Sequence, residues 1–367
     1  TAIMISLLNN ELRWKVAEVP DGDLRKDKII AALAEEFGHY ATGRPHLRSA
    51  TNDKTMADVA NESSPYPWSE VLTGTMWEIL AGMFAKYRAR PKSNTGQPPS
   101  DKEAILWAVN RFRRVAFQPL DYLPPADVQF SDYARAVLKA DELVDPVDED
   151  DFREIMKEVF TKRGIEFEPD EAESANLYFY AYDIDRISRS RTDAYHFLHE
   201  NRRQLCIPCD QDISVVDLYR TDKTIMGGGK LPSEIVLQYA WREDVPLKGS
   251  EFGRLDGETM SMLCGGTLVF DERGNLRHWV RKPGGRKQKV CAGRIRDYCK
   301  AEQARGKERR QRFKEYVASR VRGGLIGFSD RERPEEIDTH PQMVAQHAED
   351  GTLRLETTPH MRHWTEE

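Results

Sequence analysis

Apolar residues recur every three to four positions along most of the first 165 residues. This spacing puts them on one face of an α-helix, so it predicts an almost entirely helical first part. Helices are expected at residues 1–18, 27–40, 68–87, 101–114, 131–140 and 152–163. Ser131 is a candidate N-cap for the fifth of these helices, and Gly164 ends the last one.

The pattern changes after residue 170. One more short helix is expected at residues 192–203, and apolar alternation then predicts strands. The expected strands are residues 213–219, 234–241, 260–270 and 276–280. A DERGN turn joins the last two strands, which is typical of a β-hairpin. A long basic helix over residues 292–321 should end at the glycine pair Gly323 and Gly324.

The expected fold class is therefore α+β. We expect a mostly helical domain over residues 1–170 and a domain with a small antiparallel sheet over residues 171–325. Residues 326–367 are polar, and we expect them to form a poorly ordered tail.

Composition and charge narrow the classes of function. Hydrophobic residues make up 39% of the chain and charged residues 32%, which is typical of a globular protein with a charged surface. The net charge of -6 gives no general attraction to nucleic acid or anionic lipid. No apolar run approaches the roughly 18–20 residues that a membrane span requires. We therefore expect no membrane partner, and the balance disfavours nucleic acid.

The start of the chain and the cysteines bear on its origin. The chain opens on Thr1, and residues 1–8 are already apolar, as if the chain began inside a helix. We therefore expect a missing N-terminal segment, so the lack of a targeting signal leaves the localisation unknown. The five cysteines are unevenly spaced, which argues against a disulfide framework and favours a reducing, cytoplasmic compartment.

Metal-binding motifs are incomplete in this chain. It contains no HExxH, the pair of histidines one helical turn apart with a glutamate base. His196 and His199 have the wrong spacing, and Glu36 with His39 reads more simply as a solvated helix face. The CIPC sequence, Cys206 to Cys209, lacks a second pair at a suitable distance, and we interpret it as two free thiols.

Three further patterns have simple structural interpretations. The IMGGGK sequence at residues 225–230 lacks the helix start of a phosphate-binding loop, so it indicates a flexible connection. The acidic run at residues 145–151 is typical of a helix start rather than a calcium loop. Residues 281–322 carry sixteen Lys or Arg against four Asp or Glu. This basic stretch has few aromatic residues, so a solvated helix face is favoured over contact with nucleic acid.

Two segments resemble one family of enzymes. Residues 47–53 read LRSATND, and residues 64–80 read SPYPWSEVLTGTMWEIL. Together they resemble the carboxy-terminal half of thermolysin-like and fungalysin-like gluzincin metallopeptidases, in which a Leu-Arg-Ser turn precedes a long apolar helix. Residues 120–141 and 265–282 resemble stretches of large bacterial gluzincin-like proteins, and the resemblance spans residues 1–285.

The resemblance implies a zinc-dependent hydrolase that acts on a peptide or protein substrate. Arg48 would hold the scissile carbonyl, because a guanidinium offers two parallel donors to developing negative charge. The family's histidine position is Tyr66 here, whose hydroxyl can still donate but stays neutral near pH 7. The zinc ligands would lie before Thr1, so zinc belongs to the full-length protein and this chain alone is expected to be inactive.

Alternatives to the enzyme remain. A helical bundle in which Arg48 only caps a helix or pairs with an acid would also fit the first 165 residues. The parent protein could equally be a degenerate peptidase that serves as a scaffold or binding module, with the basic stretch as its docking surface. Residues upstream of Thr1 distinguish the two, since the enzyme requires HExxH and a following glutamate-bearing helix.

Overall fold

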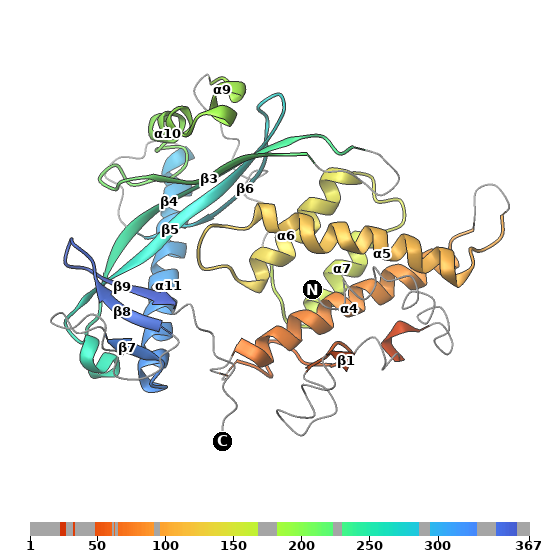
Figure 1. Ribbon diagram of the computed structural model, residues 1–367, viewed down its shortest axis with the longest axis horizontal. Helices are drawn as coiled ribbons and strands as arrows, with labels where there is room; N and C mark the ends of the chain where they lie inside the picture. The colour runs from red at the N-terminus through yellow and green to blue at the C-terminus, as the bar shows by residue number, and fades with distance from the viewer. Residues whose placement is uncertain are drawn as a thin grey trace.

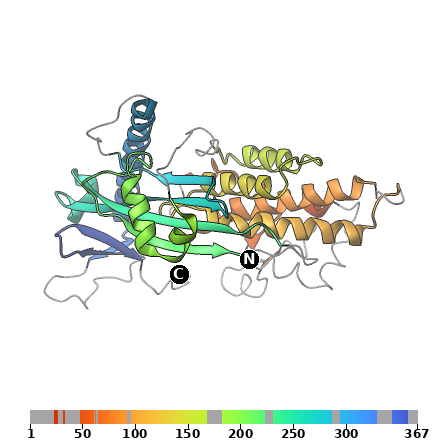
Figure 2. The same ribbon diagram turned by 90° about the horizontal axis from the view of Figure 1, so that it is seen from above.

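The computed structural model describes ten stretches of the chain. They are residues 23–26, 32–33, 48–60, 62, 65–91, 96–167, 182–222, 230–285, 294–328 and 343–357. The fold is α+β, as expected from the sequence. A helical part lies beside a part built on a twisted sheet, and both views of the ribbon separate the two (Figures 1 and 2).

Four long helices build the helical part. They are α4 (Pro65–Ala89), α5 (Asp101–Phe117), α6 (Phe130–Val144) and α7 (Phe152–Lys162). Their apolar faces form one core, in which Trp77, Phe84 and Phe160 are almost fully buried. The four expected helices in this region are thus confirmed, and α4 and α5 both extend beyond the expected ends.

The helix starts follow local polar chemistry. Ser100 caps α5, and Glu103 completes the capping box by accepting from the Ser100 backbone N–H at 2.9 Å. At α7 the Asp148 carboxylate accepts from two backbone N–H groups of the first turn, which confirms the acidic run as a helix start. The expected cap of α6 was wrong. Gln129 occupies the N-cap position, one residue before the helix and two before Ser131.

The region before α4 differs from the expectation. Ala32–Leu33 forms a short strand, β1, which pairs antiparallel with β2 (Arg48–Ser49). Residues 32–33 lie within the expected helix 27–40, so that prediction was wrong at these positions. The expected helix at residues 1–18 lies outside the described residues.

The sheet has seven strands in the described part of the chain. They are β3 (Ser214–Thr221), β4 (Glu234–Pro246), β5 (Thr259–Asp271), β6 (Leu276–Lys282), β7 (Ile326–Phe328), β8 (Met343–His347) and β9 (Leu353–Thr357). The strand order is β3-β4-β5-β9-β8-β7, and β6 also pairs with β5. The four expected strands and the β5–β6 hairpin are confirmed.

The expected polar tail needs a correction. Residues 326–328, 343–347 and 353–357 form the three last strands instead, and β9 joins β5 in parallel at Met260 and Leu353. The short apolar stretches of these strands are buried against α11 (Arg294–Arg322) and a short 3-10 helix, η4 (Ser250–Leu255). Strands this short carry too little alternation to stand out in a polar sequence.

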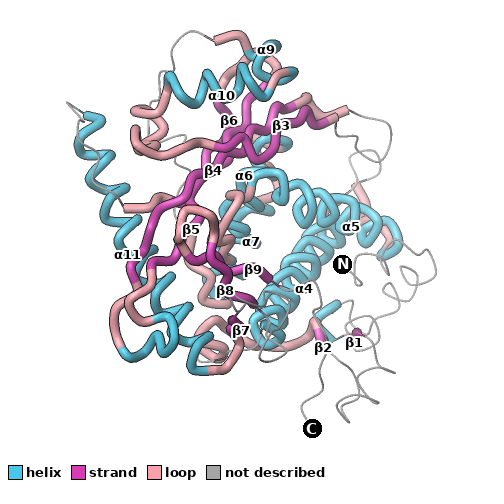
Figure 3. Tube along the Cα trace, turned by 60° about the vertical axis from the view of Figure 1, so that its left-hand side comes forward, coloured by secondary structure: helices cyan, strands magenta, loops and turns pink. Residues whose placement is uncertain are grey.

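Helices cover both faces of the sheet. On one face lie α9 (Ile184–Arg189) and α10 (Arg191–Glu200), whose Ile187 and Phe197 pack on the aromatic residues of β5 and β6. On the other face lie α6 and the 3-10 helix η3 (Gln118–Tyr122), which join the sheet to the helical part. Figure 3 shows α6 between the strands and α5.

Candidate functional site

The two segments that carry the peptidase resemblance lie against each other. The Asn52 side-chain amide donates to the backbone carbonyl of Glu70, 18 residues further along the chain, at 2.9 Å. Lys54 forms an ion pair with the Glu70 carboxylate. Ala50 is fully buried in the core of the helical part. The segment that follows β2 is therefore fixed to the first half of α4.

Arg48 is the first residue of β2, and its backbone pairs with that of Leu33 in β1. The strand β2 contacts α4. The side chain of Arg48 lies outside the described residues. What the structure fixes is the backbone that carries it, from Arg48 to the buried Ala50.

Tyr66 is the second residue of α4, in its first turn. Its side chain is 42% exposed, so it is not a core aromatic residue of a buried turn. The Tyr66 carbonyl accepts from the Ser69 hydroxyl at 2.7 Å, and the Trp68 indole donates to the carbonyl of Glu62 at 3.0 Å. These contacts fix the entry into α4 and leave the Tyr66 ring at the surface.

Arg163, which follows the last residue of α7, connects the two segments further. It is 1% exposed, and its guanidinium has acceptors on both sides. Nη2 donates to the carbonyl of Asn52 at 2.7 Å, and Nη1 donates to the carbonyl of Lys54 at 2.8 Å. Nε donates to the Glu78 carboxylate of α4 at 3.1 Å. No sequence pattern marks Arg163 as a buried residue, because an arginine before a helix-ending glycine usually lies at the surface.

The charge of Glu78 is stabilised by this arrangement. Partial burial raises its pKa, but the hydrogen bond from Lys162 and the charge of Arg163 outweigh burial and hold the pKa below its ordinary value. Lys162 lies 2.5 Å from one carboxylate oxygen and Arg163 lies 3.1 Å from the other. Glu78 therefore stays ionised near neutral pH and supplies the counter-charge that a buried guanidinium requires.

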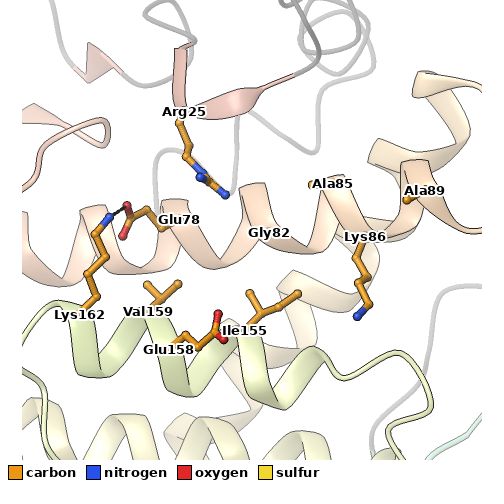
Figure 4. A pocket seen from close by; sticks show the side chains of 10 residues that line it. All are labelled: Arg25, Glu78, Gly82, Ala85, Lys86, Ala89, Ile155, Glu158, Val159 and Lys162. Atoms are coloured by element: carbon orange, nitrogen blue, oxygen red, sulfur yellow. Dashed lines mark hydrogen bonds and ion pairs between the residues drawn. The ribbon is translucent and has the colours of Figure 1, made fainter.

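A groove of about 460 Å³ runs between α4 and α7 beside this cluster (Figure 4). Its floor is apolar, with Gly82 and Ala85 on α4 and Ile155 and Val159 on α7. Charged side chains border it, and Figure 4 shows Arg25 above the floor and the Glu78–Lys162 pair at one end. Tyr66 is not among the residues that line this groove.

The described residues contain no group of three or more His, Cys, Asp or Glu that could hold a metal ion. Glu36 and His39 lie outside them. On α10, the His199 ring stacks on Tyr195, and its Nδ1 accepts from Arg202. The chain within the described ranges thus offers no ligand set that fits a catalytic zinc.

The CIPC sequence forms a loop after α10. Arg202 fixes this loop by donating to the carbonyls of Pro208 and Gln211 at 2.6 and 2.8 Å. Neither Cys206 nor Cys209 forms a disulfide in the described part of the chain. The buried Cys264 is also free, and burial raises the pKa of its thiol to about 12.

Several cations of the basic stretch form ion pairs inside the protein. Arg281 pairs with Glu302 at 2.6 Å, and both are almost fully buried. Lys282 pairs with Asp132 of α6 at 2.6 Å, and Arg309 of α11 pairs with Asp127 at 2.7 Å. The simple expectation of a solvated helix face was therefore wrong for these positions, and the same pairs leave fewer cations for a phosphate backbone. Of the IMGGGK sequence, only Lys230 lies within the described residues.

Comparison of the chain with families of proteins, with curated proteins and with solved structures finds no match. In the described ranges, no helix combines the length and the apolar character needed to cross a membrane.

Proposed function

We propose that this chain forms part of the substrate-binding wall of a zinc-dependent peptidase of the gluzincin type. The observation that carries the proposal is the contact between the two segments that resemble that family. Asn52, in the LRSATND segment, donates to the carbonyl of Glu70, in the SPYPWSEVLTGTMWEIL segment. Their contact supports a common origin for the two short resemblances.

The chain's own chemistry would be substrate binding. Arg48 would donate two hydrogen bonds to the carbonyl of the scissile peptide bond, where negative charge develops during hydrolysis. Tyr66 would contribute one further hydrogen-bond donor, its phenolic hydroxyl, from the first turn of α4. Zinc in such an enzyme activates water, but its ligands are expected outside this chain, and we derive no step through it.

The first test is the reading frame that precedes Thr1. An HExxH motif followed by a glutamate-bearing helix supports the enzyme. In the polypeptide expressed with that segment, Arg48→Ala should lower kcat on a fluorogenic peptide by roughly 10²–10³, because one donor to the oxyanion is lost. Tyr66→Phe should lower it less. Zinc content, measured by plasma mass spectrometry, should not change, since neither side chain is an expected ligand.

Arg273→Ala is the matched control, because Arg273 is exposed in the turn between β5 and β6. It should leave kcat unchanged. The enzymatic function is ruled out if the upstream reading frame lacks HExxH. It is also ruled out if the zinc-loaded polypeptide cleaves no member of a peptide library. That result would instead favour a degenerate peptidase that acts as a scaffold or binding module.

A further inference from the structure

We propose that Arg163 is a positioning residue that holds the segment after β2 on α4 and thereby sets the place of Arg48. The catalytic meaning of this inference rests on the proposed function. The holding contact itself does not, because it follows from the packing of Arg163. Arg163 lies more than 100 residues after the segment in sequence. The contact that holds the segment therefore comes from a distant part of the chain, the end of α7.

The guanidinium of Arg163 binds one particular backbone conformation of the segment after β2. Its two terminal nitrogens donate to the carbonyls of Asn52 and Lys54, two residues apart, and Nη1 also lies 3.3 Å from the Asn52 side-chain oxygen. The Arg163 backbone carbonyl accepts from the N–H of Met56 at 2.9 Å. A planar fork can satisfy two carbonyls in one fixed arrangement, whereas a lysine ammonium is a single point donor. The contact therefore specifies the backbone of residues 52–56.

Gly74 on α4 allows this close approach. A Cβ at this position would lie 2.9 Å from Nδ2 of the Asn52 side chain and 3.1 Å from Nη1 of Arg163. Either the segment or the guanidinium would have to move to admit it. The glycine of the LTG sequence in α4 is thus explained by the same contact.

The constraint reaches the backbone of Arg48 through a short connection that includes the buried Ala50. Asn52 is four residues after Arg48, a span of at most about 14 Å of extended chain. Ala50, midway between them, is fully buried, and the Asn52 side chain also accepts from the Lys54 N–H at 3.0 Å. The backbone from β2 to Asn52 therefore has little freedom to move while Arg163 holds its end.

The first experiment measures amide hydrogen exchange and needs no catalytic activity. In Arg163→Lys and Arg163→Met, residues 50–56 should exchange roughly tenfold faster or more, while α5 and the sheet keep their rates. Lys162→Met is the matched control, because it removes the other cation on Glu78 without touching the segment. Asn52→Ala should reproduce the effect even if Arg163→Met does not fold. Unchanged exchange at residues 50–56 in Arg163→Lys and Asn52→Ala overturns the proposal.

The second experiment is a double-mutant cycle on kcat in the polypeptide that contains the zinc segment. Arg163→Lys should lower kcat by roughly tenfold in the wild-type background and have no further effect in the Arg48→Ala background. Equal effects in both backgrounds would mean that Arg163 does not act through Arg48, and would overturn the positioning role. If no form cleaves peptides, the proposed function fails, and the exchange experiment still decides whether Arg163 holds the segment.

Discussion

The hydroxyl of Tyr122 lies between the two parts of the molecule. Tyr122 is fully buried, and its hydroxyl is 2.8 Å from both carboxylate oxygens of Glu234 at the start of β4. Gln118 donates to the same hydroxyl at 3.1 Å. Burial and the neighbouring charge of Glu234 raise the Tyr122 pKa far above its ordinary value, so the group remains a donor. A buried carboxylate without this donor would lose a charge-assisted hydrogen bond.

We therefore expect Tyr122→Phe to lower the free energy of unfolding by about 1–3 kcal/mol, because Glu234 loses this buried hydrogen-bond donor while the ring still fills its place. Urea unfolding followed by circular dichroism measures this difference. Tyr195→Phe is the control, since that ring is 37% exposed on α10 and should change stability by less than about 0.5 kcal/mol. Equal midpoints for Tyr122→Phe and the wild type would contradict the expectation.

Single buried charged residues were the hardest feature to predict from the sequence. Arg163 and Arg309 lie in polar stretches, and their acceptors include backbone carbonyls from distant segments. No periodicity marks such a partner, because the contact is made only when the fold brings the segments together. Arg48 and Tyr66 came from short sequence resemblance, and the contact of their segments could not have been derived from pattern alone.

At the level of elements, α4 and α7 approach closely at one glycine. A Cβ on Gly82 would lie 2.6 Å from Cγ2 of Ile155, which is closer than packed carbon atoms come. The glycine lowers helix propensity by about 1 kcal/mol relative to alanine, yet it lies in the middle of a long helix. The close approach, which also forms the floor of the groove in Figure 4, explains why it is tolerated there.

Gly82→Ala should consequently destabilise the protein by about 1 kcal/mol, since overpacking outweighs the gain in helix propensity. In the Ile155→Ala background, the same substitution should be neutral or stabilising, because the clashing methyl group is gone. Thermal unfolding of the four proteins gives the coupling between the two positions. If Gly82→Ala stabilises both backgrounds equally, the two helices can separate without loss.

Elements were predictable in proportion to their length and amphipathicity. The helices from α4 to α7 each bury a continuous apolar stripe, and β4 and β5 are 13 residues long. The strands β7 to β9 have three to five residues, and their pairing depends on α11 and η4 rather than on their own pattern. The pair β1 and β2 has two residues in each strand, too short for any periodic signal.

At the scale of the whole molecule, the segment after η3 docks the helical part on the sheet. Thr267 of β5 donates to the Leu123 carbonyl at 2.7 Å, and a Cβ on Gly265 would lie 3.1 Å from Pro125. The stretches 120–141 and 265–282, both singled out by resemblance, meet here through these contacts and the Lys282–Asp132 ion pair. The two stretches thus form a shared docking surface between the helical part and the sheet.

Arg309 closes this surface from α11, and its removal gives the strongest test of the docking. Its guanidinium donates to Asp127 at 2.7 Å and to the Leu263 carbonyl at 2.6 Å, and it is 4% exposed. Arg309→Met should lower the free energy of unfolding by about 3 kcal/mol, because a partly buried carbonyl and an ion-pair partner lose their donor together and this guanidinium is itself buried. Arg312→Met, at an exposed position of the same helix, should stay within about 0.5 kcal/mol of the wild type.

The residues whose amides lose protection against hydrogen exchange distinguish a loss of docking from a general loss of stability. If Arg309 joins the two parts, amides of residues 121–127 should exchange faster in Arg309→Met, while those of α4 and α5 keep their protection, since the helical core does not depend on α11. Hydrogen exchange with mass spectrometry resolves these segments. Equal acceleration throughout α4 and α5 would show that the helical part cannot hold its core without the sheet. The two parts would then form one cooperative unit rather than two cores joined at a polar surface.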